Sequence, residues 1–299
     1  MGGTYQLHKG EASLSDLVDG RLAMGSGVGN IYFAIQTTES YYAEFEDQFQ
    51  GEYPDGTVKV HNTIQGAINA CTANRGDIVY VIGEWTSTAT ITLNKWGTSL
   101  IGATNWNSIT GGGNSNITCT GAGIATLTVT KAKCHVENLV LYFNGTGVTK
   151  GIEFSGSAPS QTIVRNVECV KNGGDSAAGY GIKFTTVPTR SEFSNIKITG
   201  TTKNTLQMAY GIQGGEYSCV FRDIVVSNAT VGINLDTYGG LFHRVIVAGT
   251  CGSGMDIYGD SAAQSMMVDC RNMGASKGAM TNMVFSGSYS TGLTELTAA

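Results

Sequence analysis

The side chains best suited to acid–base chemistry are Asp236 and Asp256, which stand in two similar segments of the sequence with His243 between them. Alternation in these segments predicts that both carboxyl groups point outward from neighbouring strands, and Asp260 follows closely. Hydrolysis of a glycosidic bond needs two such groups, because one protonates the leaving oxygen while the other activates water or attacks the sugar. If the chain is an enzyme, Asp236, Asp256 and His243 are therefore its candidate catalytic residues.

The residues around these aspartates argue against catalysis. The outward column that contains Asp256 is mixed in charge, and it reads Glu153, Lys183, Gln213, Asn234 and Asp256. Such a row favours a solvated or inter-subunit hydrogen-bonding surface, since a fold by itself confers no chemistry. A lyase would need a basic residue beside calcium held by several acids, and the basic cluster at 222, 243 and 244 has only Asp223 nearby. The histidines show no metal-ligand spacing, so we expect no enzyme, no cofactor and no metal.

A repeat along the chain predicts how these side chains are positioned. The pair Gly-Ile recurs at Gly123-Ile124, Gly151-Ile152, Gly181-Ile182, Gly211-Ile212 and Gly232-Ile233, and then as Gly254-Met255. An apolar-x-apolar triplet runs in step at Leu139/Leu141, Val167/Cys169, Ile196/Ile198, Ile224/Val226, Val245/Val247 and Val268/Cys270. Periods of roughly 20 to 30 residues with short strands between them indicate a solenoid. The expected fold is all-β, a parallel β-helix, and it is right-handed because parallel crossovers generally are.

The repeat also predicts the interior and one corner of the coil. Phe193, Phe221 and Phe242 occupy equivalent places in consecutive turns of the coil, or rungs, and are expected to form an aromatic stack. Asn and Asp tolerate left-handed turn conformations and can hydrogen-bond along a stack. The column that precedes the triplets therefore marks a corner, and it reads Asn138, Asn166, Asn195 and Asp223.

Composition limits the possible functions. The 299 residues include 42 Gly, only 3 Pro and 14% charged residues, so turn residues are abundant and charged helical faces are few. A net charge of -5 without basic runs predicts no nucleic-acid partner. No stretch approaches the roughly 18 apolar residues of a membrane span, and the first residues lack the pattern of a secretory signal. Seven cysteines without paired spacing are expected to be buried free thiols of a protein assembled in a reducing cytoplasm.

A capping motif stands at the start of the repeat. A helix is expected over Asn62–Ala73, with Asn62 as its cap, and it would cover the open end of the coil. The segments that follow are Gly76-Asp77-Ile78-Val79-Tyr80-Val81, Ile91-Thr92-Leu93-Asn94-Lys95 and Ser99-Leu100-Ile101-Gly102-Ala103. This opening resembles that of pectate-lyase-like right-handed parallel β-helix proteins, and the resemblance covers about residues 58 to 285. One departure is Ile82-Gly83-Glu84-Trp85, where many members have Pro-Gly-Thr-Tyr.

The resemblance implies a fold rather than an activity, because this superfamily holds polysaccharide lyases and hydrolases alongside many phage and virus particle proteins. Residues 1–57 do not repeat and resemble, more loosely, the attachment regions of virion β-helix proteins. This arm is too glycine-rich to fold alone, so we expect it to bind capsid or sister subunits. Its apolar anchors are Ile31, Phe33, Tyr41, Phe45 and Phe49. Val225 and Ile246 add an outward apolar pair that needs cover, and viral relatives imply a homotrimer.

These observations predict three regions and one function. Residues 1–57 form the attachment arm, residues 58–286 the β-helix with its capping helix at 62–73, and residues 287–299 a tail. We expect a structural protein of a virus or bacteriophage particle, as a head decoration, fibre or tail-associated protein, assembled in the host cytoplasm and located in the virion. The alternatives are a phage polysaccharide depolymerase, hydrolase or lyase, and an adhesin that binds surface glycans without cleaving them. Enlarged loops at 144–150, 172–180 and 200–209 would carry such binding.

Overall fold

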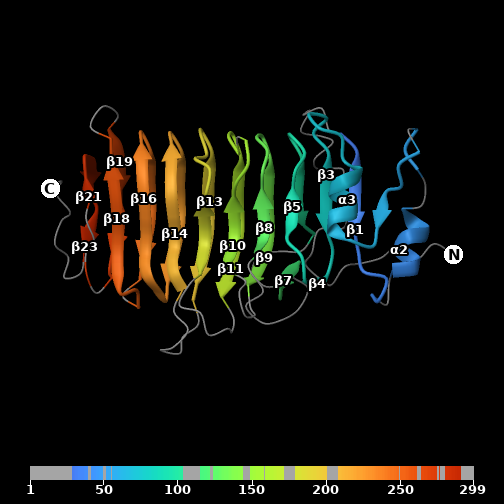
Figure 1. The fold of residues 1–299 in the computed structure, drawn as a ribbon, viewed down its shortest axis with the longest axis horizontal. Coiled ribbons are helices and arrows are strands. Elements are labelled where there is room, and N and C mark those ends of the chain that lie inside the picture. The colour runs from blue at the N-terminus through green and yellow to red at the C-terminus, as the bar shows by residue number, and fades with distance from the viewer. Residues whose placement is uncertain are drawn as a thin grey trace.

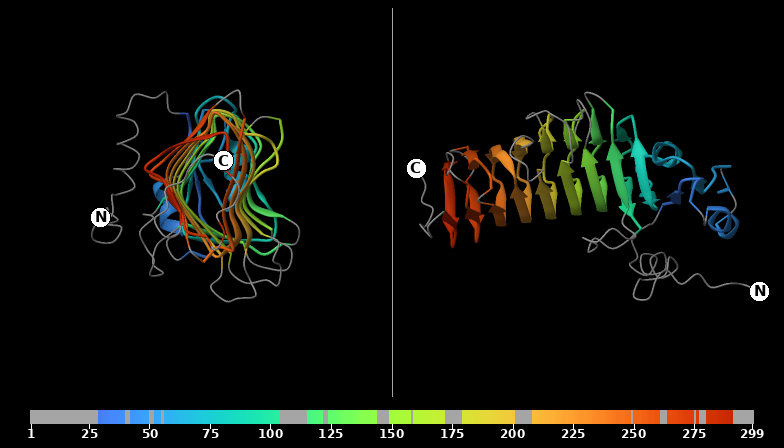
Figure 2. Two further views of the ribbon diagram at one scale, coloured as in Figure 1. Left: turned by 90° about the vertical axis from the view of Figure 1, so that its left-hand side faces the viewer. Right: turned by 90° about the horizontal axis from the view of Figure 1, so that it is seen from below.

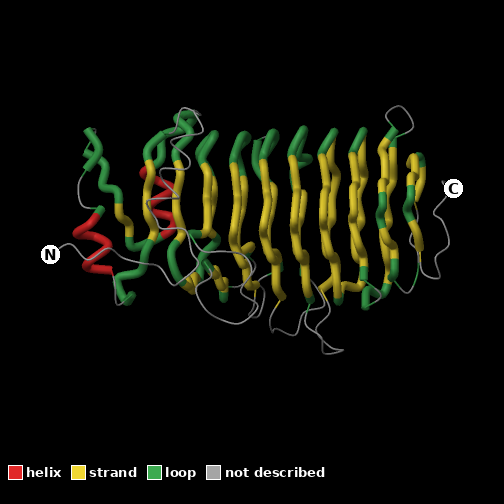
Figure 3. Tube along the Cα trace, turned by 180° about the vertical axis from the view of Figure 1, so that it is seen from behind, coloured by secondary structure: helices red, strands yellow, loops and turns green. Residues whose placement is uncertain are grey.

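The computed structural model places the strands in one continuous coil, with the helices at its N-terminal end (Figures 1 and 3). The structure describes residues 29–39, 42–49, 52–54, 56–103, 115–121, 124–143, 149–157, 159–171, 179–200, 208–248, 250–260, 264–274, 276 and 280–290. The two helices are α2 (Tyr42–Gln48) and α3 (Ile64–Ala70). No helix in the described ranges is long and apolar enough to cross a membrane.

The strands form two sheets, and every pairing of named strands is parallel. The first, called the long sheet, contains β1 (Ile31–Ala34), β2 (Val60–His61), β3 (Ile78–Val81), β4 (Glu84–Ser87), β6 (Ser99–Gly102), β7 (Asn116–Cys119), β9 (His135–Phe143), β11 (Ile163–Lys171), β13 (Glu192–Thr199), β15 (Val220–Ser227), β17 (Leu241–Val247), β19 (Ser265–Val268), β20 (Arg271–Asn272), β22 (Met283–Ser286) and β23 (Tyr289–Ser290). The second, called the short sheet, contains β5 (Ile91–Leu93), β8 (Ala125–Val129), β10 (Lys150–Phe154), β12 (Tyr180–Phe184), β14 (Met208–Tyr217), β16 (Ala229–Tyr238), β18 (Ser253–Gly259) and β21 (Met280–Thr281). From β8 to β18 the chain alternates between the sheets, so each rung of this part contributes one strand to each (Figure 2).

The inward columns confirm the predicted repeat. Ile152, Ile182, Ile212, Ile233 and Met255 pair in register across β10, β12, β14, β16 and β18, and all are buried. The aromatic stack is also confirmed, since Phe193 lies 5.0 Å from Phe221 and Phe221 lies 4.9 Å from Phe242, centroid to centroid. These superposed side chains fill the space between the sheets, which removes apolar surface from water along the whole coil.

Two assignments at the ends of the repeat were wrong. Leu127, not Ile124, pairs with Ile152, so the pair Gly123-Ile124 is not the first member of the Gly-Ile column. In the last rung Arg271 pairs with Ile246, which places Cys270 and Asn272 at the inward positions instead of Val268 and Cys270. The bend explains the second shift, because Asp269 adopts φ 52° and lies opposite Arg244 at the corner.

The corner column lies where it was predicted. Asn138, Asn166, Asn195 and Asp223 all adopt left-handed backbone conformations, with φ between 50° and 56°. The amide of Asn166 donates to Oδ1 of Asn138 at 3.0 Å, and that of Asn195 donates to Oδ1 of Asn166 at 2.8 Å. Short polar side chains suit this column because they tolerate the left-handed bend and link one rung to the next.

The capping helix is shorter than predicted. Helix α3 begins at Ile64, and Thr63, not Asn62, is its N-cap, since its Oγ1 accepts a hydrogen bond from the Gly66 amide at 3.0 Å. Ile64, Ala67 and Ile68 are buried in the core of the coil. The helix therefore covers apolar surface of the first rungs, which is the role predicted for it.

The boundary at residue 57 is corrected by the structure. Strand β1 pairs with β3 over four residues, so Ile31–Ala34 belongs to the long sheet rather than to a separate arm. A two-residue strand, β2, pairs with β1 in turn. At the other end β23 pairs with β20, which extends the coil past residue 286. A single strand such as β1 could not be recognised by repetition, because the enlarged segment between β1 and β3 hides its register.

All seven cysteines are buried and free, which confirms the expectation of core thiols. Burial raises the pKa of Cys71, Cys134 and Cys219 to about 12. A thiol with so high a pKa carries almost no thiolate at neutral pH and is a poor nucleophile. These cysteines therefore act as small apolar side chains.

Candidate functional site

Asp236 and Asp256 point outward from neighbouring strands of the short sheet, as expected. Asn234 pairs with Asp256 and Asp236 pairs with Tyr258, so the two aspartates lie on a diagonal between β16 and β18. Two residues along a strand and one strand across it separate their Cα atoms by about 8 Å. Asp236 is exposed and Asp256 is partly buried. This arrangement offers two carboxyl groups on one open face.

His243 does not join them. It lies on β17 in the long sheet, where its Nε2 is 4.0 Å from Oδ2 of Asp269. The strands of the two sheets face opposite sides of the coil, so the candidate catalytic set of Asp236, Asp256 and His243 is not one site. Among the described residues, no group of three or more His, Cys, Asp or Glu side chains is arranged to hold a metal ion.

The outward face of the short sheet carries a second polar group, called the tyrosine strip. Tyr180 and Tyr210 stack at 5.6 Å with their rings 3° from parallel, and Nζ of Lys183 lies 4.9 Å from the Tyr180 centroid. Lys183 also donates to Gln213. On the next rung Glu153 accepts from Lys150 at 2.8 Å and from Thr185 at 2.7 Å. The mixed column predicted here is thus a network of hydrogen bonds between rungs.

Val225 and Ile246 lie side by side on the outer face of the long sheet, as predicted. They pair across β15 and β17, and 38% of the Val225 side chain is exposed. Arg271 follows Ile246 in this column, where Asp269 had been expected. The pair is a small apolar patch in which Val225 is exposed and Ile246 is partly exposed.

A larger apolar surface, which we call the corner ridge, runs along the corner where the chain leaves the short sheet for the long sheet. On the short-sheet side it contains Val187, Tyr217 and Tyr238, and on the long-sheet side Val220, Leu241, Met266 and Val284. Tyr217 stacks on Tyr238 at 4.4 Å, and only two residues separate each tyrosine from the long-sheet strand that follows it. The exposed fractions of Val187, Tyr217, Met266 and Val284 are 49%, 42%, 43% and 39%. The ridge therefore presents one apolar surface over successive rungs.

The sequence did not predict this ridge. Its members belong to different strands and different sheets, so the two repeats do not bring them together. The available signal was the pair of turns: Tyr217 and Val220 flank the left-handed Ser218, and Tyr238 and Leu241 flank the left-handed Gly239.

The predicted anchors of the N-terminal arm pack on the chain's own coil. Phe33 is 3% exposed and contacts the rings of Phe45, Phe49 and Tyr80 at 4.7–6.0 Å between centroids. Ile31 lies against the same cluster. Pairing of β1 with β3 therefore places Phe33 in the chain's own core, whereas Ile31, Phe45 and Phe49 stay partly exposed. Tyr41 lies outside the described residues.

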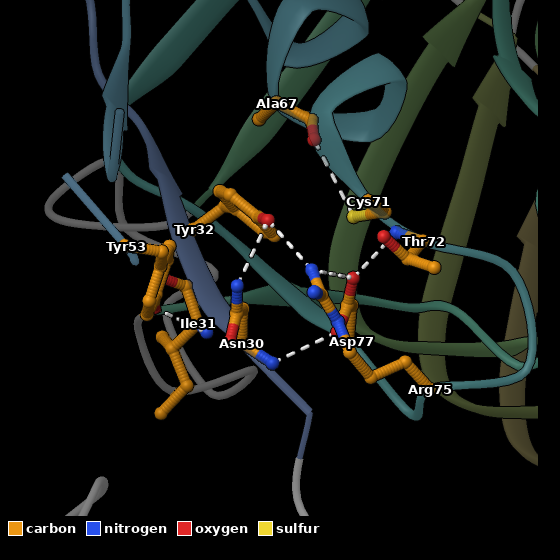
Figure 4. A network of polar contacts seen from close by, with 9 residues as sticks. All are labelled: Asn30, Ile31, Tyr32, Tyr53, Ala67, Cys71, Thr72, Arg75 and Asp77. Atoms are coloured by element: carbon orange, nitrogen blue, oxygen red, sulfur yellow. Dashed lines mark hydrogen bonds and ion pairs between the residues drawn. The ribbon is translucent and has the colours of Figure 1, made fainter. Parts of the chain in front are cut away.

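A buried network fixes this segment (Figure 4). The carboxylate of Asp77 is fully buried and accepts from both Nε and Nη2 of Arg75, at 2.6 and 2.8 Å. It also accepts from the backbone amides of Asn30 and Thr72, at 2.8 and 2.6 Å. Arg75 donates in addition to the hydroxyl of Tyr32 at 2.8 Å. Asp77, which belongs to the predicted opening motif, thus links the start of β1 to the end of the capping helix α3.

The parallel sheets and the stacked inward columns define a parallel β-helix protein. No family model and no curated protein matches the sequence. Among solved structures, the chain is similar to a pectin methylesterase from Aspergillus niger, at 14% identity and TM-score 0.46, over 92% of this chain and 91% of that one. It is also similar to tailspike protein 2 of the Escherichia coli O157:H7 bacteriophage CAB120, at 12% identity and TM-score 0.36, over 76% of this chain and 39% of that one.

Proposed function

We propose that this chain is a structural protein of a virus particle, as a head decoration, fibre or tail-associated component, and that it acts through protein–protein contacts. The observation that carries the proposal is the corner ridge, because apolar side chains exposed side by side are unfavourable in water and favour burial against a protein. The Val225–Ile246 patch adds a second surface of this kind on the long sheet.

The coil is suited to such a role. Each rung pairs with the next through parallel backbone hydrogen bonds and packed inward columns, so the molecule is a rod whose surface features repeat at a fixed spacing. Contacts along a rod add up over many rungs. The opening motif also resembles a superfamily that includes many particle proteins, which supports a virion as the location.

The test is incorporation into particles. We expect particles purified on a density gradient, from cells that express this chain with the rest of its genome, to contain it at fixed stoichiometry by mass spectrometry. Leu241→Asp and Met266→Asp should reduce its occupancy at least tenfold, because each places a charge on the corner ridge. Met273→Asp is the matched control, since Met273 is 47% exposed but lies off the ridge. Normal occupancy of both ridge variants would contradict the proposal.

The tyrosine strip supports a second candidate function, the binding of surface glycans. Aromatic rings beside hydrogen-bonding side chains suit the apolar faces and hydroxyl groups of sugars, and Tyr180, Lys183 and Gln213 provide both. Binding of a polysaccharide panel that is lost in Tyr180→Ala would support this role. Release of reducing ends or unsaturated sugars, abolished by Asp256→Asn, would instead favour a depolymerase and overturn the structural role.

A further inference from the structure

The long sheet has an uncovered edge at β4. Among the described strands β4 pairs with β7 alone, and the amide of Thr120, which follows β7, donates to the Ser87 carbonyl at 3.0 Å. The backbone groups of alternate residues along a strand point to opposite edges. Trp85 and Ser87 therefore bond β7, whereas Glu84 and Thr86 direct their amide and carbonyl groups to the other side.

Two glutamine side chains bond parts of this rung's edge in place of a strand. The Gln36 amide donates to the carbonyl of Glu84. The Gln65 amide bonds both backbone groups of Thr92 in β5, since it donates to the carbonyl at 3.2 Å and accepts from the N–H at 2.8 Å. Between these two places, the backbone amide and carbonyl of Thr86 have no partner among the described residues. A carboxamide has the donor and acceptor of a peptide group, so this edge already selects the groups that a strand would bring.

A hollow of about 440 Å³ lies beside the edge, within the size range of ligand-binding clefts. Part of its wall is formed by Trp85, Ile64 and Ile91, which belong to the core of the coil. Apart from Ala89, the other lining residues carry hydroxyl or amide groups, and no lining residue is charged. Because burial of an unpaired charge is costly, such a hollow favours an uncharged occupant with an apolar group on its inner side.

An extended peptide fits these features, and the register of the sheet sets its bonds. Every pairing of named strands in the coil is parallel, so a strand that continues the sheet runs parallel to β4. The peptide residue opposite Trp85 then donates its amide to the Glu84 carbonyl, and its own carbonyl accepts from the Thr86 amide. Its side chain points inward, as that of Trp85 does, and enters the hollow. The second residue after it donates to the Thr86 carbonyl.

We propose that β4 receives an uncharged, extended segment of a partner protein as a parallel strand, and that this segment displaces the Gln36 amide from the Glu84 carbonyl. Main-chain hydrogen bonds supply the affinity, and the hollow selects an apolar side chain opposite Trp85. The site lies toward the N-terminal end of the coil, away from the corner ridge (Figure 1). The inference therefore goes beyond the proposed function and does not depend on it.

A displayed library of random short peptides, selected on the full chain, supplies the probe. We expect the enriched peptides to be uncharged, with one apolar residue between Ser, Thr or Val residues. By fluorescence polarisation, their affinity should fall at least tenfold in Thr86→Pro, which removes an N–H that the described chain leaves unbonded. Thr86→Val is the matched control, because it keeps the amide and should bind like the wild type. A selection without enriched peptides, or peptides that bind Thr86→Pro as tightly as the wild type, would overturn the inference.

Methylation of the peptide's backbone nitrogens, one at a time, tests strand pairing on the wild-type chain. A strand bonds β4 through alternate residues, so methyl groups on those nitrogens should lower the affinity at least tenfold and those between them should not. Gln36→Ala should tighten binding about threefold, because the peptide amide no longer competes with that side chain. Weaker binding by Gln36→Ala would contradict the displacement. Peptides that tolerate every methyl group and are displaced by neutral oligosaccharides would make the hollow a sugar site and overturn the strand addition.

Discussion

At the scale of single residues, the surroundings of Glu137 and Glu216 shift the pKa values of these two carboxyl groups in opposite directions. Glu137, on the outer face of the long sheet, is largely buried, which by itself raises its pKa. Hydrogen bonds and charges from His135 and Arg165 outweigh burial and bring the pKa of Glu137 down to about 2. The carboxylate is therefore more stable in the folded chain than in the unfolded one.

We predict that Arg165→Met destabilises the fold by about 1 kcal/mol at pH 7, a value reduced by the partial exposure of Arg165. Because the folded pKa of Glu137 is lowered, its stabilisation is present above pH 4.5 and is lost as the pH falls toward 2. Urea unfolding at pH 7 and at pH 3 should show the difference between variant and wild type shrinking with acid. Lys131→Met is a control on a partly exposed lysine away from Glu137. An equal difference at both pH values would contradict the role given to Arg165.

The pKa of Glu216 is shifted in the opposite direction, upward. It is 2% exposed, it accepts from the Cys219 amide at 2.7 Å and from the Thr237 hydroxyl, and burial raises its pKa. A raised folded pKa means that the stability contributed by this group is full below the unfolded value of 4.5 and is lost as the pH rises through the folded value. Ionisation of the buried carboxyl group therefore weakens the fold as the pH rises.

We predict that Glu216→Gln, which keeps the shape and accepts the same amide hydrogen bond, raises the melting temperature at pH 8 by several degrees. The gain should shrink toward pH 4, where the wild-type side chain is already neutral. Glu192→Gln is the matched control, on the outer face of β13. Thermal unfolding followed by circular dichroism from pH 4 to pH 8 measures both, and a gain that does not depend on pH would refute this account.

At the scale of the elements, the Gly-Ile column has a steric cause. A Cβ atom on Gly211 would overlap Cγ1 of Val226 and the carbonyl oxygen of Gly232, and Gly181 and Gly232 are crowded in the same way by Ile198 and Val247. The glycine therefore lets the short sheet approach the second apolar residue of each triplet. The Gly-Ile repeat and the apolar triplet repeat therefore both reflect this contact between the two sheets.

We predict that Gly211→Ala destabilises the fold by about 1–3 kcal/mol, the usual cost of inserting a methyl group into a packed interior. Gly215→Ala on the same strand is the control, because the nearest atom to its new Cβ would be Cγ2 of the exposed Val187, at 3.3 Å. Denaturant unfolding of the two variants gives the comparison. Equal stabilities would mean that the sheets can separate without cost at this position.

Sequence reasoning succeeded where one physical constraint recurs in every rung, as in the phenylalanine stack and the left-handed Asn column. It failed where a feature occurs once or joins unlike elements. The pair Gly123-Ile124 matched the repeat by composition but not by register, because nothing in two residues specifies the pairing with β10. The candidate site was divided for the same reason: Asp236 and His243 are close in sequence, but the corner between them sends their side chains to different sheets.

At the scale of the whole molecule, the N-terminal segment completes the coil instead of standing apart from it. The amides of Ile78 and Ile82 donate to the carbonyls of Asn30 and Ala34, at 2.9 and 3.0 Å. Tyr53 reinforces β1, since its hydroxyl bonds both the amide and the carbonyl of Ile31. Removal of residues 1 to 50 would leave β3 as an uncovered edge of the long sheet, so this segment is part of the coil.

We predict that deletion of residues 1–50 lowers the melting temperature by about 10 °C and speeds amide hydrogen exchange at Ile78 and Ile82 at least a hundredfold, because both amides lose their acceptors. Deletion of residues 1–28 is the matched control, since it leaves Asn30, β1 and the Asp77 network in place. Exchange followed by mass spectrometry should locate the effect in β3 and leave β15 and β17 unchanged. If both truncations melt like the full chain, the N-terminal strand contributes no stability, and its aromatic residues are again available for the attachment role first expected of them.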